Sequence, residues 1–96
     1  MNDKLKSAEA NLLIDGMMRL KTREEYYNFF EDLLTAAELK SIAVRFYAAK
    51  LLHEGKTYNE IAALTGVSTA TISRISRCLA YGADGYNAVL ERMKKS

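Results

Sequence analysis

Residues 57–75, TYNEIAALTGVSTATISRI, contain the signals that decide how this chain folds. Thr57 and Glu60 have the spacing of a capping box, in which the hydroxyl and the carboxylate each bind a free backbone amide at a helix start. Gly66 is expected to end that helix, because glycine adopts the left-handed conformation without a Cβ penalty. Ser68 is a favourable N-cap for a second helix. The stretch therefore predicts two short helices joined by a tight turn.

Small or branched apolar residues occupy the positions where these two helices would cross. Steeply crossing helices need such residues because their backbones come close. Along the second helix, Ile72, Ile75 and Leu79 recur at the three- and four-residue spacing of one buried face. We predict a helix-turn-helix over residues 57–81. The alternative, a compact helical hairpin with no binding role, does not explain the residues on the opposite face.

That opposite face carries short hydroxyl and methyl side chains near its start and arginines further along. Such a pattern suits a helix end inserted into the major groove of DNA, with hydroxyls and methyls at base edges and arginines at guanine or phosphate. Residues at the start of the first helix would meet the DNA backbone. The predicted DNA-binding residues are Lys56, Tyr58, Asn59, Ser68, Thr69, Ala70, Thr71, Ser73, Arg74 and Arg77.

The composition predicts one small all-α domain. The 96 residues include no proline, 49% are hydrophobic and 27% are charged, which is ordinary for a globular protein. Long stretches are rich in the helix-forming residues Ala, Leu, Glu, Lys and Arg. We expect a single domain over residues 1–96, with dimerisation and core helices in 1–56, the helix-turn-helix in 57–81 and a C-terminal helix in 82–96.

The distribution of charge and the lack of targeting signals indicate where the protein is located and what it binds. The net charge is +2, with −2 in residues 1–34 and +4 in residues 35–96, so the half with the predicted helix-turn-helix is the basic one. No apolar run reaches the length of a membrane-spanning helix, and the N-terminus lacks a signal-peptide core. We therefore expect a cytoplasmic protein with no membrane partner.

Three further capping signals precede or follow the helix-turn-helix. Thr22 with Glu25 and Thr35 with Glu38 have capping-box spacing, and Asp84 could cap the last helix. A first helix is expected over residues 5–20. A long helix after Thr35 should bury one stripe and end at Gly55; the stripe is Leu39, Ile42, Ala43, Phe46, Ala49 and Leu52.

A dimer is indicated by the apolar surface of the N-terminal half. The helix after Thr22 has aromatic or leucine residues around more than half of its circumference: Tyr26, Tyr27, Phe29, Phe30, Leu33 and Leu34. A helix this apolar over so wide an arc needs partners on two sides. In a chain of this length those partners are most simply supplied by a second copy. The alternative is a one-sided core helix with exposed tyrosine hydroxyls.

The order of these elements resembles the tryptophan-repressor superfamily, and within it the YerC/YecD branch. The resemblance rests on residues 33–79, LLTAAELKSIAVRFYAAKLLHEGKTYNEIAALTGVSTATISRISRCL. It implies six helices and an intertwined homodimer whose N-terminal helices wrap the partner. It also implies two reading heads on double-stranded DNA and the function of a DNA-binding transcriptional regulator, a repressor.

The resemblance also implies a possible ligand pocket formed by Thr35, Arg45, Arg74, Ile75 and Cys78. In tryptophan repressor an arginine from the central helix and one from the recognition helix clamp the corepressor. Arg45 and Arg74 stand at the matching positions. The family's glycine and serine are replaced here by Ile75 and Cys78, which argues against tryptophan as a cofactor and leaves the small-molecule effector unknown. A paired or stacked Arg45 and a phosphate-binding Arg74 are the alternative reading.

No catalytic or metal site is predicted. His53 has no cysteine or carboxylate partners at ligand spacing, and it is better placed to interact with a helix end. The single cysteine, Cys78, excludes an internal disulfide. The chain has no evident nucleophile with a base nearby, so an enzyme is not expected. The remaining alternative to DNA binding is a helical protein-interaction module within a transcription or recombination assembly.

Overall fold

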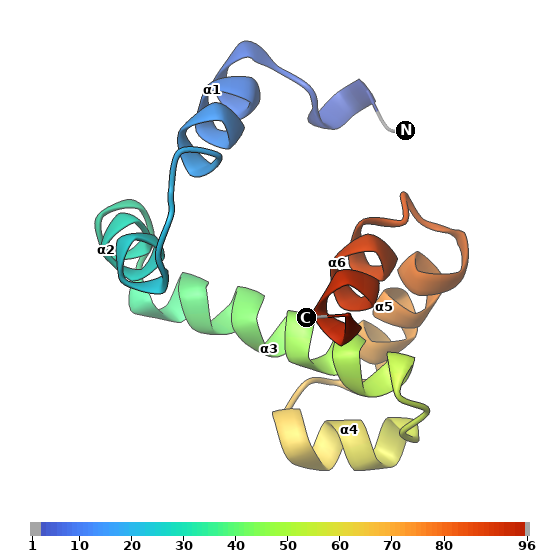
Figure 1. The fold of residues 1–96 in the computed structure, drawn as a ribbon. Helices are drawn as coiled ribbons and strands as arrows, with labels where there is room; N and C mark the ends of the chain where they lie inside the picture. Colours follow the sequence, from blue (N-terminus) through green and yellow to red (C-terminus); the bar gives the residue numbers. More distant parts are fainter. Residues whose placement is uncertain (1–2, 96) are drawn as a thin grey trace. The chain divides into compact units, whose positions relative to one another are not determined.

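A computed structural model describes residues 3–95 of the chain. Within that range a short 3-10 helix at Asp3–Leu5 is followed by six α-helices, and no strand is present (Figure 1). This confirms the all-α fold class. The α-helices are α1 (Ala8–Met17), α2 (Arg23–Leu33), α3 (Ala36–His53), α4 (Tyr58–Thr65), α5 (Thr69–Tyr81) and α6 (Gly85–Lys94).

The chain divides into two compact units. The first reaches to Leu39 and holds α1, α2 and the start of α3; the second begins at Lys40 and holds the rest of α3 with α4, α5 and α6. None of the helices in the described residues is long and apolar enough to cross a membrane.

Most of the predicted helix starts follow the expected hydrogen bonds. The hydroxyl of Thr35 accepts from the amide of Glu38 at 3.1 Å, and the Glu38 carboxylate accepts from the amide of Thr35 at 2.8 Å. These backbone and side-chain hydrogen bonds from Thr35 lower the pKa of Glu38 below 4.5. Glu25 differs, because its carboxylate accepts from the amide of Lys21 at 2.8 Å.

One predicted helix was too long, and one predicted cap lacks its side-chain hydrogen bond. The first helix begins at Ala8 rather than residue 5, because the hydroxyl of Ser7 accepts from the amide of Ala10 at 3.0 Å and so caps the helix there. Asp84 stands at the N-cap of α6 but makes no capping hydrogen bond, since its backbone is left-handed with φ 67°. Its carboxylate instead accepts from the side chain of Asn87 at 3.0 Å.

The core of the second unit joins α3, α4 and α5. Its apolar side chains are at most 5% exposed: Ala48, Ala49, Leu51, Ile61, Ile72 and Ile75. Ile72 and Ile75 confirm the buried face predicted for the second motif helix. Because Ala48 and Ala49 are small and fully buried, the neighbouring helices pack close to the backbone of α3.

The predicted core stripe of α3 was wrong in part. Ala49 is buried and Leu52 packs against the core. Ile42 is 51% exposed and Ala43 is also exposed, whereas Ala48 and Leu51, which were not in the stripe, are buried. The helix is apolar around most of its circumference, so its sequence periodicity does not single out one face. Contacts with α4 and α5 select the face that is buried in the second unit.

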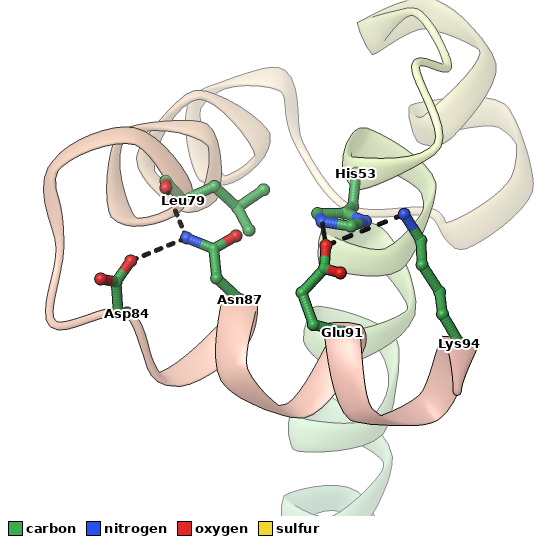
Figure 2. Close-up of polar contacts among 6 residues, drawn as sticks. All are labelled: His53, Leu79, Asp84, Asn87, Glu91 and Lys94. Atoms are coloured by element: carbon green, nitrogen blue, oxygen red, sulfur yellow. Dashed lines mark hydrogen bonds and ion pairs between the residues drawn. The ribbon is translucent and has the colours of Figure 1, made fainter. Parts of the chain in front are cut away.

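Helix α6 is attached by polar contacts to both α5 and α3 (Figure 2). The amide nitrogen Nδ2 of Asn87 donates to the carbonyl of Leu79 in the last turns of α5 at 2.9 Å. One turn later, Glu91 Oε1 lies 3.2 Å from His53 Nε2 at the end of α3, and Lys94 Nζ lies 3.8 Å from the same oxygen. Leu90 on the same helix is buried, with 4% of its surface exposed.

The turn between α4 and α5 is closed by Gly66 and Thr65. Gly66 has φ 75°, and its amide donates to the carbonyl of Ala62 at 2.9 Å. The Thr65 hydroxyl donates to the carbonyl of Ile61 at 2.7 Å and accepts from the amide of Val67 at 3.1 Å. The role of Gly66 was expected from the sequence, whereas the two hydrogen bonds of the Thr65 hydroxyl were not.

Replacing Gly66 by alanine should lower the free energy of unfolding by about 1 kcal/mol, because a Cβ is disfavoured in the left-handed conformation. Gly16→Ala is the matched control. Gly16 lies inside α1 with open space around the position of a Cβ, so the same substitution should stabilise the protein by about 0.5 kcal/mol. Urea denaturation of both variants measures the difference, and equal effects would contradict the conformational argument.

Candidate nucleic-acid interface

The exposed face of α5 carries the side chains that were predicted to read DNA. Thr69, Ala70, Arg74 and Arg77 are exposed, and Ser73 is partly buried. The opposite face of the same helix is held in the core by Ile72 and Ile75. The structure thus separates an apolar face that fixes α5 from a polar face that is open to a partner.

Two of the predicted reading residues are tied to each other at the start of α5. The Ser68 hydroxyl accepts from the amide of Thr71 at 3.2 Å and donates to the hydroxyl oxygen of Thr71 at 3.0 Å. Ser68 therefore caps the helix, as predicted. The oxygen of Thr71 accepts that bond while its own hydroxyl hydrogen remains available as a donor.

The residues expected at the DNA backbone lie at the start of α4. Lys56, Tyr58 and Asn59 are all exposed. They follow one another closely around the Thr57 cap, whose hydroxyl accepts from the amide of Glu60 at 3.1 Å and whose amide donates to Glu60 Oε1 at 3.3 Å. The reciprocal capping box was predicted and is confirmed. The capping box ties the carboxylate of Glu60 to the backbone amide of Thr57 and so holds the start of α4 in one position.

The two arginines of α5 have no acidic partner at this surface. Among residues 3–95, neither Arg74 nor Arg77 forms an ion pair. Lys56 forms none either, but it interacts electrostatically with Glu54. Unpaired cations on an exposed helical surface attract polyanions and can form charge-assisted hydrogen bonds with phosphate or with guanine.

Four of the five residues expected at a ligand pocket do surround one cavity. Its volume is about 240 Å³, and it is lined by Arg45, Thr71, Arg74, Ile75, Cys78 and Tyr86. Arg45 is exposed and makes no ion pair in the described part of the chain. Ile75 is only 3% exposed and belongs to the core, so a branched aliphatic group forms part of the cavity wall.

Thr35 is not among the residues that line this cavity. It belongs to the first unit, where it caps α3 and borders a separate hollow with Tyr27, Phe30 and Leu39. Tyr86 was not predicted at the cavity. It comes from α6, and its ring centroid lies 6.3 Å from that of Phe46 on α3. No spacing pattern links Tyr86 to the motif, because it reaches the cavity only through the packing of α6.

A second hollow adjoins the first through shared residues. Cys78 and Tyr86 line both, and the remaining wall of the second hollow, which measures about 430 Å³, is apolar: Phe46, Ala83, Gly85 and Val89. Cys78, the single cysteine of the sequence, is exposed and has a free thiol.

The six α-helices of residues 3–95 and the exposed polar face of α5 define an all-α protein with a helix-turn-helix. The chain belongs to the Trp repressor family: the family model described as Trp repressor protein matches residues 8–94. The resemblance inferred from residues 33–79 is thereby confirmed.

Two known proteins show which members of the family this chain is similar to. The chain is 48% identical over 94 residues to the uncharacterized protein YerC of Bacillus subtilis (strain 168), covering 98% of this chain and 90% of that protein. It is 44% identical over 62 residues to a Trp operon repressor homolog of Chlamydia caviae, covering 64% and 61% of the two chains.

The fold is also found in a solved structure. The crystal structure of a TrpR like protein from Eubacterium eligens superposes with a TM-score of 0.91 at 48% identity, covering 97% of this chain and 96% of that one. Together these similarities identify a TrpR-like regulator of the YerC branch.

Proposed function

We propose that this protein is a sequence-specific DNA-binding transcriptional regulator, a repressor, that acts as a homodimer through α4 and α5. The observation that carries the proposal is the two-sided construction of α5. Ile72 and Ile75 fix it in the core, while Thr69, Ala70, Arg74 and Arg77 remain exposed. Short hydroxyl and methyl groups followed by arginines on one exposed face are the residue types that a helix in the major groove uses.

Reading of bases would centre on the first turns of α5. Thr69 and Ala70 offer methyl groups for thymine, and the hydroxyls of Thr69 and Ser73 offer hydrogen bonds to base edges or bridging waters. Lys56, Tyr58 and Asn59 at the start of α4 would contact the sugar-phosphate backbone and set the register. In a dimer the two copies of α5 would enter successive major grooves about 34 Å apart on a palindromic operator.

The proposal of a homodimer is supported by the first unit. No side chain of residues 4–39 is buried, and several large apolar groups are widely exposed, among them Leu12 at 74%, Met18 at 71% and Tyr27 at 63%. So much exposed apolar surface on a small chain marks an interaction site. A second copy would cover it and give both chains a shared core.

The homodimer is tested by Tyr27→Glu. Placing a carboxylate where an aromatic ring is buried between two chains should dissociate them, because an unpaired buried charge is costly. Light scattering should report a wild-type mass of twice the 10.8 kDa of one chain and a variant mass near that of one chain. Tyr81→Glu is the matched control. Tyr81 is 88% exposed in the second unit, so this variant should remain a dimer. A wild-type monomer would contradict the proposal.

DNA binding is tested by selecting genomic fragments with the purified full-length protein, with and without added tryptophan. A two-fold symmetric motif recovered in both conditions is the expected result. Measured affinity for that motif should fall steeply as salt rises, because phosphate contacts release counterions. Absence of any enriched sequence would contradict the proposal and favour a protein-interaction module instead.

Regulation without tryptophan is part of this proposal. Ile75 of α5 lies in the same buried cluster as Ala48 and Ala49 of the central helix, so protein side chains hold α5 in the core. Cys78 also offers a weaker hydrogen-bonding group than a serine at the cavity wall. Recovery of the motif only when tryptophan is present would refute this part while leaving DNA binding intact.

A further inference from the structure

Arg45 was predicted at the ligand pocket and not among the DNA-contacting residues, and it lies on α3, outside the helix-turn-helix. It nevertheless lines the same cavity as Thr71 and Arg74 of α5. The central helix therefore presents a cation beside the face of α5 that is left open to a partner. No pattern in the sequence of residues 57–81 includes this group.

The cavity concentrates positive charge that the protein does not neutralise. Within residues 3–95, neither Arg45 nor Arg74 forms an ion pair, although Lys50 on the same helix pairs with Glu54. Two guanidinium groups that face one space repel each other until an anion enters. Each can donate two parallel hydrogen bonds to phosphate oxygens, a geometry that a lysine ammonium cannot reproduce.

Neutral donors at the cavity match the same kind of ligand. The Thr71 hydroxyl oxygen already accepts from Ser68, so its hydrogen remains available for another acceptor. Tyr86, whose side chain carries a second hydroxyl, also lines the cavity. Arginine forks and hydroxyl donors with no lining carboxylate are the chemistry of an oxyanion site.

The position of the cavity identifies the source of the anion. Thr71 and Arg74 belong to the helix that is proposed to enter the major groove, so a DNA strand bound there passes beside the cavity. Ile75 is buried in the core and forms part of the cavity wall. We propose that the cavity receives one phosphate of the DNA backbone, held by Arg45 from α3 and Arg74 from α5. This inference rests on the proposed DNA-binding function.

The test measures the salt dependence of operator affinity for Arg45→Gln. Each phosphate contact contributes about 0.9 to the slope of log affinity against log salt. A dimer loses one contact from each chain, so the slope should decrease by about 1.8. At low salt the affinity should fall by roughly tenfold or more, equally on operator and random DNA, because a phosphate contact carries no base information.

Two further variants separate this contact from general loss of charge. Lys40→Gln removes one positive charge from the same helix at an exposed position that does not line the cavity, and its slope should stay near the wild-type value. Arg45→Lys keeps the charge but loses the two-pronged hydrogen bonding. It should therefore keep most of the slope and lose part of the affinity. Equal melting temperatures of the three variants verify that each is folded.

Several results would overturn the inference. An Arg45→Gln slope equal to that of wild type or of Lys40→Gln would exclude a phosphate contact while leaving the proposed function standing. A tryptophan-dependent rise in wild-type affinity that Arg45→Gln abolishes would make the cavity a ligand pocket. Millimolar inorganic phosphate could raise the melting temperature of the wild-type protein. If Arg45→Gln abolished that rise and left the salt slope unchanged, the cavity would be a site for a free anion. Failure of the wild-type protein to bind any DNA would overturn the proposed function as well.

Discussion

Ile72→Ala should lower the free energy of unfolding by about 3 kcal/mol and leave the protein partly unfolded at physiological temperature. Ile72 has no exposed surface, and it lies in the cluster that joins α3, α4 and α5. Alanine removes three carbon atoms there and leaves a cavity that fully packed neighbours cannot close. The loss therefore includes a transfer contribution and a cavity contribution.

The measurement is chemical denaturation at matched protein concentrations, since association of chains adds to apparent stability. Leu64→Ala provides the control in the same helix pair, because Leu64 on α4 is 58% exposed and should change stability by less than about 1 kcal/mol. If both variants lost equal stability, the division of the motif into a buried and an exposed face would be wrong. DNA affinity of folded Ile72→Ala should also decline, because the same side chain fixes the orientation of α5.

Arg77→Ala should weaken operator binding by about 1 to 3 kcal/mol, which corresponds to roughly 5- to 150-fold in affinity. Arg77 is exposed on α5, one turn beyond Ser73, and forms no ion pair in residues 3–95. An arginine free of acidic partners at this position can donate two hydrogen bonds to a guanine edge. Loss of such a contact should relax sequence preference at one position of each half-site.

The result is checked by comparing affinity for the operator with affinity for random DNA. A base contact lowers the first much more than the second, whereas an equal loss on both would identify Arg77 as a phosphate contact. Lys95→Ala removes one charge from the end of α6 and serves as the control. This pattern also distinguishes Arg77 from Arg45, for which equal losses on both DNAs are expected.

Dimer formation and DNA binding make separate demands on the two units. The first unit offers exposed apolar groups on α1 and α2, and the second offers an exposed polar face on α5. Tyr27→Glu should therefore abolish cooperative binding to a palindrome while leaving α5 folded. Under the proposed function, this division predicts that association and base recognition can be varied independently.

The sequence alone was sufficient for helix boundaries that depend on local hydrogen bonds. Thr57 with Glu60, Thr35 with Glu38, Ser68 and Gly66 each act within about one turn of chain, so their spacing was enough to predict them. Asp84 stands at the predicted N-cap of α6, but its backbone is left-handed and its carboxylate accepts from Asn87 instead of capping the helix. The exposed hydroxyl and arginine residues of α5 were likewise predictable from their spacing along one helix.

Tertiary structure decided which apolar face is buried and which distant residues meet. Helix α3 is apolar around most of its circumference, so only packing against α4 and α5 could select Ala48 and Leu51 over Ile42. The cavity required α3, α5 and α6 to come together, which placed Tyr86 beside Arg45 and Arg74 although no sequence spacing relates them. Local capping depends on neighbouring residues in the chain, whereas burial and the cavity depend on contacts between helices far apart in sequence.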